Sequence, residues 1–304
     1  MKRSVIQLGN NTSVVSLPFS WIKKYGVKKG DEVDIEEAGD SLMIRINAVP
    51  VAEKVEVDMT GFDEKALFHG MIGLHRYGYD ELKIQYKPET LRMIQSAVNN
   101  KMLGFAMVDQ TSKQCTLRSL SNEIPGEFDG ALRRAFLVTL SLGTASMEMI
   151  REQNFEALPD LINLEETNNQ LTNFCLRILT KKSKEKESFL KYVVVWNLEK
   201  VADEYKYLCQ ELARSAEEID PKLIETFEEV NELVKSFYGL FYKFDNTVFN
   251  ETCNKKKLLE NKLKDVKTRN MGEFTLINHS LGLVQRAGDF ATSLYALFHN
   301  RSNP

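Results

Sequence analysis

Cysteine is scarce in this sequence: the four residues, at positions 115, 175, 209 and 253, include no CxxC pair. A disulfide framework is therefore not expected, and reduced thiols in a cytoplasm fit best. Long apolar runs are also missing, because the richest, Tyr192 to Trp196, is far shorter than the roughly 18 residues that span a bilayer. We expect a cytoplasmic protein without membrane insertion.

Catalytic signatures are absent as well. The chain of 304 residues contains no P-loop, nucleophile elbow, HExxH pair or GxGxxG loop. Its carboxylate pairs have no accompanying base or nucleophile motif, so no enzymatic activity is predicted. The length leaves room for two or three domains.

Acidic residues are missing from the first thirty positions, which contain six basic ones: Lys2, Arg3, Lys23, Lys24, Lys28 and Lys29. The whole chain has a formal net charge of −3, so the remainder sums to −9. A basic segment attached to an acidic body is typical of a nucleic-acid module joined to a regulatory part. A solvated basic surface that binds nothing has the same composition.

Turn residues divide the first 47 residues into short strands and one helix. Apolar runs at 5–8 and 14–17 flank Gly9-Asn10-Asn11, and Pro18 suits the start of a helix that Gly26 can close. Alternating apolar residues at 33–35 and 42–46 flank Gly39-Asp40. So short a segment rarely buries enough surface to stand alone, which favours oligomerisation.

The run GNNTSVVSLP at 9–18, followed by WIKKYGVKKGDEV at 21–33, resembles the AbrB/MazE-type swapped-hairpin domain. Proteins of that family form interleaved dimers that present basic loops to DNA. The resemblance implies a dimer whose DNA contacts come from the matching positions: Lys2, Arg3, Asn10, Asn11, Ser13, Lys23, Lys24, Lys28 and Lys29. Because lysines mostly contact phosphate, modest sequence selectivity is expected. A dimerisation module without DNA affinity is the alternative, and Trp21 is interpreted as core rather than as a base-stacking platform.

Residues 52–121 alternate between strand and helix patterns. Strands are predicted at 54–59, 81–86, 104–109 and 114–118, with helices at 63–77 and 88–98 and a turn at Asn99-Asn100. The βαβαββ order predicts a small two-layer α/β domain. Its residues indicate no chemistry, so a spacer or effector-sensing role is expected.

Beyond the linker Ser121 to Gly126, whose Pro125 and Gly126 form a candidate hinge, long amphipathic stretches replace the strand patterns. Six helices are predicted, at 128–155, 160–180, 186–216, 221–248, 253–269 and 272–299. Such helices with short connections pack as an antiparallel bundle. The predicted fold class is a multidomain α+β protein with domains at 1–47, 52–121 and 128–304.

A carboxylate motif recurs in the helical half. Glu199 and Asp203 are four residues apart and share a helix face, and Gln285 and Asp289 are their counterparts 86 positions later. The same offset carries Glu165 onto Glu251. Three helices repeated once is the simplest account.

These motifs resemble PhoU, the phosphate-uptake regulator, whose two three-helix repeats carry E-x-x-x-D motifs that line metal clusters. Archaeal proteins similar to this chain join a swapped-hairpin domain to a PhoU-like bundle. The resemblance implies a divalent or iron ion on Glu165, Glu199, Asp203 and Asp289. Gln285, Asn169 and Lys255 depart from the acidic pattern, so an ion pair of Lys255 with Asp289 in place of the metal is an alternative.

The combined resemblance implies a transcriptional regulator of phosphate homeostasis. DNA would be bound by the N-terminal dimer, while the helical half senses a metal, a phosphate-linked signal or a partner protein. The alternative function is a PhoU-like adaptor that docks on a phosphate transporter or a signalling protein without binding DNA.

Overall fold

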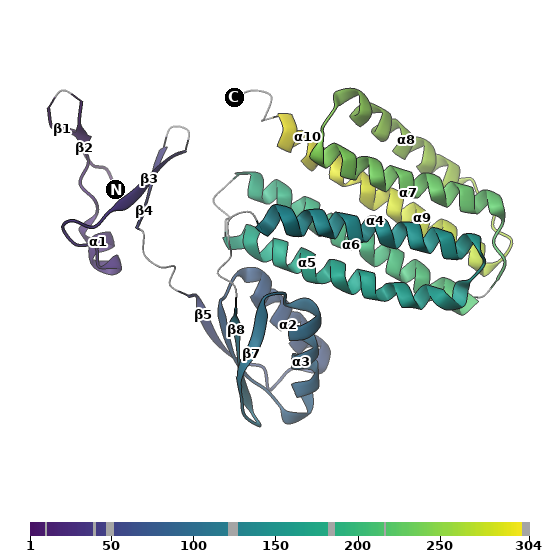
Figure 1. Cartoon of the computed structure of the whole chain (residues 1–304), viewed down its shortest axis with the longest axis horizontal. Coiled ribbons are helices and arrows are strands. Elements are labelled where there is room, and N and C mark those ends of the chain that lie inside the picture. The colour runs from purple at the N-terminus through teal and green to yellow at the C-terminus, as the bar shows by residue number, and fades with distance from the viewer. Residues whose placement is uncertain are drawn as a thin grey trace. The chain divides into compact units, whose positions relative to one another are not determined.

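The computed structural model describes residues 1–9, 11–38, 41–46, 52–120, 127–181, 186–215 and 217–299. The chain divides into two compact units, Met1–Ala52 and Glu53–Pro304 (Figure 1). Several predicted features lie outside the described residues: Asn10, the turn Gly39-Asp40, and the linker with its candidate hinge at Pro125 and Gly126.

The N-terminal module, residues Met1–Ala52, consists of two hairpins and a short helix. Strands β1 (Ile6–Gln7) and β2 (Ser13–Val14) pair antiparallel, as do β3 (Val33–Ala38) and β4 (Ser41–Ile46). Helix α1 (Phe19–Tyr25) begins after Pro18 and ends at Gly26, whose φ of 67° is a conformation that glycine adopts without strain. The predicted strands and helix are therefore present.

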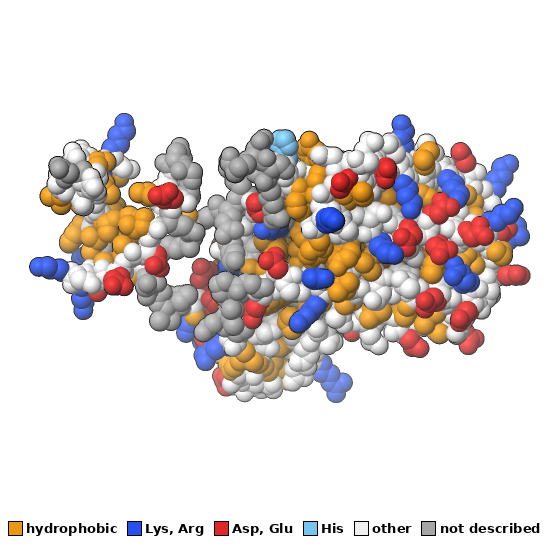
Figure 2. All heavy atoms as spheres, turned by 45° about the horizontal axis from the view of Figure 1, so that its top comes forward, with side chains coloured by type: hydrophobic (Ala, Val, Ile, Leu, Met, Phe, Trp, Pro, Cys, Tyr) orange, Lys and Arg blue, Asp and Glu red, His pale blue; other side chains and the backbone are white. Residues whose placement is uncertain are grey.

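The second hairpin is amphipathic, and its apolar face is uncovered. Val33 lies opposite Ile46, and Ile35 opposite Ile44, so these side chains share one face of the β3–β4 pair. Ile35 is 61% exposed, and none of the described residues of the module is buried. Figure 2 shows the hydrophobic side chains gathered on the surface of this module. The described residues of a single copy of the module therefore form no buried core.

The second unit opens with a four-stranded sheet in the order β5 (Lys54–Asp58), β6 (Glu81–Gln85), β8 (Gln114–Ser119) and β7 (Phe105–Gln110). Strands β5 and β6 are parallel, and the other pairs are antiparallel. Helix α2 (Glu64–Tyr77), a 3₁₀ turn η1 (Pro88–Thr90) and α3 (Leu91–Lys101) complete the predicted βαβαββ order. The turn predicted at Asn99-Asn100 is wrong, because α3 continues through both residues.

The rest of the unit is helical, as predicted, and its helices lie side by side in Figure 1. The elements are α4 (Glu127–Arg151), a 3₁₀ segment η2 (Phe155–Leu161), α5 (Ile162–Lys181), α6 (Lys186–Ser215), α7 (Pro221–Tyr242), α8 (Asn246–Lys264), α9 (Met271–Gly288) and α10 (Phe290–His299). No helix among the described residues is both long enough and apolar enough to cross a membrane. The organisation into two PhoU-like repeats stays a prediction.

Several helix boundaries differ from the prediction: the fourth helix ends at Tyr242 instead of 248 and the fifth at Lys264 instead of 269. Three further differences have local reasons. The first helix ends at Arg151 instead of 155, because Gln153 adopts a φ of 55°. The fifth begins at Asn246 instead of 253, since the Asp245 side chain accepts from the Val248 amide and caps it. The sixth is interrupted at Asp289, which divides it into α9 and α10.

The α/β layer and the helices have separate hydrophobic cores but are joined through α5. The Arg177 side chain of α5 is 1% exposed and donates to the carbonyl oxygens of His75 (3.1 Å) and Tyr79 (2.7 Å). It also donates to Asp80 Oδ1 at 2.6 Å and lies over the Phe105 ring. This buried guanidinium, with hydrogen bonds to three acceptors of the α/β layer, fixes that layer against the helices.

Candidate DNA-binding surface and carboxylate cluster

The basic residues assigned to DNA are all exposed where the structure describes them. Lys2 and Arg3 precede β1, Asn11 and Ser13 lie at the β1–β2 turn and on β2, and four lysines follow: Lys23, Lys24, Lys28 and Lys29. Lys23 and Lys24 occupy the last turn of α1, where the helix dipole favours positive charge. Such exposed ammonium and guanidinium groups can contact phosphate without first breaking a buried interaction.

The loop between α1 and β3 contains local hydrogen bonds to backbone and side-chain acceptors. The Lys28 amide donates to Asp31 Oδ2 at 2.7 Å, and the Val27 amide donates to the Ile22 carbonyl at 3.1 Å. Trp21 is half-buried, with its ring centroid 5.7 Å from that of Tyr25. Its interpretation as a core residue stays a prediction, because a single copy of the module buries none of its described side chains.

Residues 6–54 match the family model described as antidote-toxin recognition MazE, bacterial antitoxin. A MazE/AbrB-type domain lies at the N-terminus. The match supports the swapped-hairpin DNA-binding module predicted from GNNTSVVSLP and the residues after it, and domains of this type bind DNA and act as dimers. It ends at residue 54, so it does not extend to the PhoU resemblance. No curated protein and no solved structure matches the chain significantly.

Outside the MazE/AbrB-type domain, the structure brings together three of the four carboxylates assigned to a metal. Glu165 on α5 is buried, and its Oε1 accepts from Lys206 Nζ at 2.7 Å and from Asn169 Nδ2 at 2.6 Å. Asp203 on α6 accepts from the same Lys206 at 2.7 Å. The carboxylates of α5 and α6 are thus bridged by one ammonium group.

Further cations complete this carboxylate cluster, defined here as Glu165, Glu199 and Asp203. Arg76 of α2 donates to Glu199 Oε2 at 2.7 Å, and Lys200 lies 2.9 Å from Asp203 and 3.6 Å from Glu199. Lys101, at the end of α3, is 4.0 Å from Glu165. Three carboxylates therefore face four positive charges.

The proton affinities of the cluster follow from this pairing. Burial raises the pKa of Asp203, but hydrogen bonds from Lys206 and Lys200 outweigh it, so the net pKa is lowered. For Lys206, burial lowers the pKa, yet hydrogen bonds to Asp203 and Glu165 raise it above the usual lysine value. Both groups are held in their charged forms near neutral pH.

This arrangement does not fit a metal centre. A multinuclear site needs carboxylate oxygens whose charge is free to offset the metal, and here ammonium and guanidinium groups already occupy them. Among the described residues, no group of three or more His, Cys, Asp or Glu side chains is placed to hold an ion. The predicted metal ion has no support from this geometry and stays a prediction for direct measurement.

Asp289 does not join the cluster. It is exposed at the junction of α9 and α10, and within the described ranges its carboxylate makes no hydrogen bond or ion pair with the other three. Lys255 forms no ion pair with Asp289 in that part of the chain either. The sequence repeat therefore does not bring its two halves to one site.

The cationic partners were missed by sequence reasoning for two different reasons. Lys200 and Lys206 stand three residues on either side of Asp203, so helical spacing could have indicated both. Arg76 and Lys101 belong to the α/β layer, far away in sequence, and no local pattern connects them to Glu199 or Glu165.

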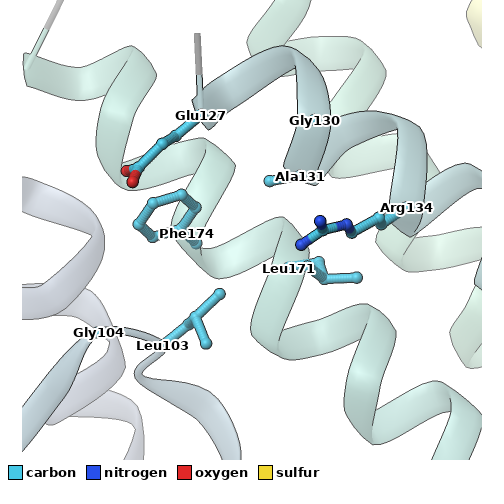
Figure 3. Close-up of a pocket in the computed structure, with 8 residues that line it drawn as sticks. All are labelled: Leu103, Gly104, Glu127, Gly130, Ala131, Arg134, Leu171 and Phe174. Carbon is cyan, nitrogen blue, oxygen red and sulfur yellow. The ribbon is translucent and has the colours of Figure 1, made fainter. Parts of the chain in front are cut away.

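Two cavities flank α5 where it meets the α/β layer. The first, about 430 Å³, lies between the Leu103-Gly104 turn, α4 and α5. Figure 3 shows apolar Leu103, Leu171 and Phe174 around it, with the Glu127 carboxylate and the Arg134 guanidinium on different sides. One charge of each sign on a mostly apolar lining defines no reaction. The second cavity borders the carboxylate cluster.

Proposed function

We propose that this protein is a DNA-binding transcriptional regulator that acts in the cytoplasm as a dimer or larger assembly and is not an enzyme. The observation that carries the proposal is the MazE/AbrB-type match over residues 6–54, together with the exposed basic residues of that module. The uncovered apolar face of β3–β4 supports a second copy as its cover.

The unit Glu53–Pro304 is proposed as the sensing part. Its α/β layer is fixed to the helices by Arg177, so a ligand held between them can act on both. A link to phosphate homeostasis belongs to this proposal and is supported by the motif resemblance of the helical half. A phosphate transporter or signalling protein is the corresponding candidate partner.

DNA binding is tested with the full chain at stepped salt. Twelve basic residues per dimer, about half of them on phosphate, give an expected slope of log K against log salt near −5. Lys23→Ala with Lys24→Ala should weaken binding to all sequences alike, whereas Asn11→Ala should reduce selectivity more than affinity. The matched control is Lys257→Ala with Lys267→Ala, which removes the same charge from exposed positions in the other unit.

A monomer in solution, or no binding at low salt, would remove the regulator and favour the adaptor function. One observation favours that second candidate: Phe189, Val193 and Trp196 form an exposed apolar row on one face of α6. A partner protein docked there would give an adaptor, or an antitoxin-type regulator as the family description suggests. Loss of partner capture in Phe189→Asp, with DNA binding retained, would show that both functions coexist.

A further inference from the structure

The second cavity, of about 310 Å³, lies where α2 and the end of α3 face α5 and α6. Arg76 and Gly73 line it from α2, Lys101 from α3, and Trp196, Glu199 and Lys200 from α6. All of its lining residues are described, and all belong to one compact unit. The cavity is large enough for a small organic molecule.

The lining is strongly cationic for a partly buried site. Arg76, Lys101 and Lys200 have side chains 19%, 16% and 28% exposed, and Glu199 is the single carboxylate among the lining residues. The lining residues alone have a surplus of two positive charges. When Asp203 beside Lys200, Glu165 near Lys101 and Lys206 between these two carboxylates are counted as well, the surplus is one. Opposite charges attract more strongly there than in bulk water, so an anion would be favoured.

Two of the three cations, Arg76 and Lys200, are already held in place by hydrogen bonds and by the Trp196 ring, and the third, Lys101, is fixed at its backbone. Arg76 Nε donates to Asn173 Oδ1 at 2.7 Å, and its guanidinium and the Lys200 ammonium both lie over the Trp196 ring, at 5.5 and 5.1 Å from its centroid. Asn173 in turn donates to the Lys101 carbonyl at 2.9 Å. Lys101 is the least satisfied of them, because its nearest carboxylate oxygen is 4.0 Å away. Such preorganisation reduces the entropy cost of binding an anion.

Gly73 is an exposed glycine of α2 at the edge of the cavity. It lies inside the helix, where glycine costs about 1 kcal/mol relative to alanine. A Cβ built on Gly73 meets no atom within 4 Å, so packing does not demand glycine there, whereas a Cβ built on Gly70 of the same helix would lie 3.2 Å from Met59 Cε. Since Gly73 lines the cavity, a methyl group at this position would project toward the space that a ligand would fill.

We propose that this cavity binds the phosphate group of a small phosphorylated metabolite or free inorganic phosphate. An anionic phosphate group suits this positive surplus, and the planar guanidinium of Arg76 with two lysines offers the N–H donors whose hydrogen bonds phosphate oxygens accept. Phe68 and the Trp196 edge leave an apolar side for an organic group. The phosphate site gives the proposed sensing unit a class of ligand. Its regulatory role rests on the proposed function, whereas the binding of phosphate does not.

The chain's two tryptophans allow a direct measurement. In the full-length Trp21→Phe protein, Trp196 is the remaining tryptophan and reports on the cavity. The fluorescence of Trp196 is measured while inorganic phosphate or glucose 6-phosphate is added at constant ionic strength. Potassium chloride is the control for a salt without phosphate, and glucose is the control for a sugar without charge. A saturable response to the phosphate compounds alone is expected.

Paired variants locate the site. Lys101→Met should weaken phosphate binding by about 10- to 100-fold, the range for one lost charged hydrogen bond. Lys101→Arg should retain binding, and Lys191→Met, a control on α6 outside the cavity, should leave it unchanged. Gly73→Ala should raise the Tm and yet weaken binding, whereas Gly239→Ala, at an exposed position in α7 with equal space, should raise the Tm alone.

The outcomes separate the alternatives. Tighter binding of glucose 6-phosphate than of phosphate identifies an organic phosphate, and the reverse identifies the free ion. A response that chloride reproduces, or one that Lys101→Met and Gly73→Ala both leave unchanged, overturns the proposal. A saturable response to manganese chloride alone, lost in Asp203→Asn, would overturn it in favour of a metal site. Because DNA is not present, failure of DNA binding does not affect the result.

Discussion

The two units differ in where their hydrophobic and charged side chains lie. In the module Met1–Ala52, no described side chain is buried, and the six basic residues of its first thirty positions face solvent. In the unit Glu53–Pro304, two cores are closed, and lysines and arginines pair with carboxylates between the layers. The same residue types are therefore exposed to solvent in one unit, whereas in the other they connect the α/β layer to the helices.

The largest effect is expected from a charge on the uncovered face of the N-terminal module. Ile35→Asp should abolish the dimer, because a carboxylate would then be buried between two copies. Loss of half the phosphate contacts should lower DNA affinity by about 10²- to 10³-fold. Sedimentation and fluorescence anisotropy measure the two results.

Leu258→Asp is the matched control, because it places the same charge on an exposed apolar residue of the other unit. It should leave assembly and DNA binding unchanged. Equal behaviour of the two variants would mean that the apolar face of β3–β4 is not an interface.

The second effect concerns this connection between the α/β layer and the helices. Arg177→Ala leaves Asp80 and the His75 and Tyr79 carbonyls without their shared donor, and should reduce the free energy of unfolding by about 3–5 kcal/mol. Arg118→Ala, which removes an arginine paired with Glu81 at the exposed sheet face, should cost about 0–1 kcal/mol. Urea unfolding measures both, and similar losses would show that burial does not distinguish the two arginines.

A third, smaller effect is expected from acid. Burial, and then the positive charge of Arg177, lower the pKa of His75 from 6.5 to about 3. Below pH 6.5, His75 therefore binds a proton in the unfolded chain but not in the folded chain, and the free energy of unfolding falls as the pH decreases. At pH 5 the loss should be about 2 kcal/mol relative to neutral pH.

His75→Leu should remove this part of the pH dependence. His279 acts in the opposite direction: burial lowers its pKa, but hydrogen bonds to Glu204 and Glu211 raise it overall, so its contribution is lost as pH rises. The module Met1–Ala52 has no histidine and provides the internal comparison. The measurement is the change in urea midpoint between pH 7.5 and pH 5, for the wild-type protein and for His75→Leu. An equal change in the two proteins would contradict the prediction.

The smallest effect is expected from chelation. If Arg76, Lys200 and Lys206 neutralise the carboxylate cluster, EDTA should leave the Tm of the full chain unchanged. Thermal unfolding with and without EDTA measures the Tm, and elemental analysis of protein purified without chelator measures the metal content. A stoichiometric metal whose occupancy falls in Asp203→Asn would restore the metal site predicted from the sequence.

Much of the fold could be predicted because its signals are local. The βαβαββ order followed from alternating apolar residues in the strands and from residues that begin or end a helix, such as Asp63, which caps α2, and Gly78, which ends it. The errors fell at helix ends, as at Asp245 and Asp289, where a cap or a short interruption competes with a continuous apolar pattern. The candidate DNA-binding residues came from the resemblance of residues 9–33 to the swapped-hairpin family, and the basic charge of the first 30 positions agreed with that assignment.

The sequence by itself determined the elements, the basic N-terminal module and the shared helix face of Glu199 and Asp203. Only the tertiary structure decided what those carboxylates face: Arg76 lies 123 positions from Glu199, and Lys206 lies 41 from Glu165. Helical periodicity depends on neighbours along the chain, whereas hydrogen bonds and Coulomb interactions depend on distance in space. An acidic motif that resembles a metal site therefore became, once α2 and α5 were packed together, the border of a cationic cavity.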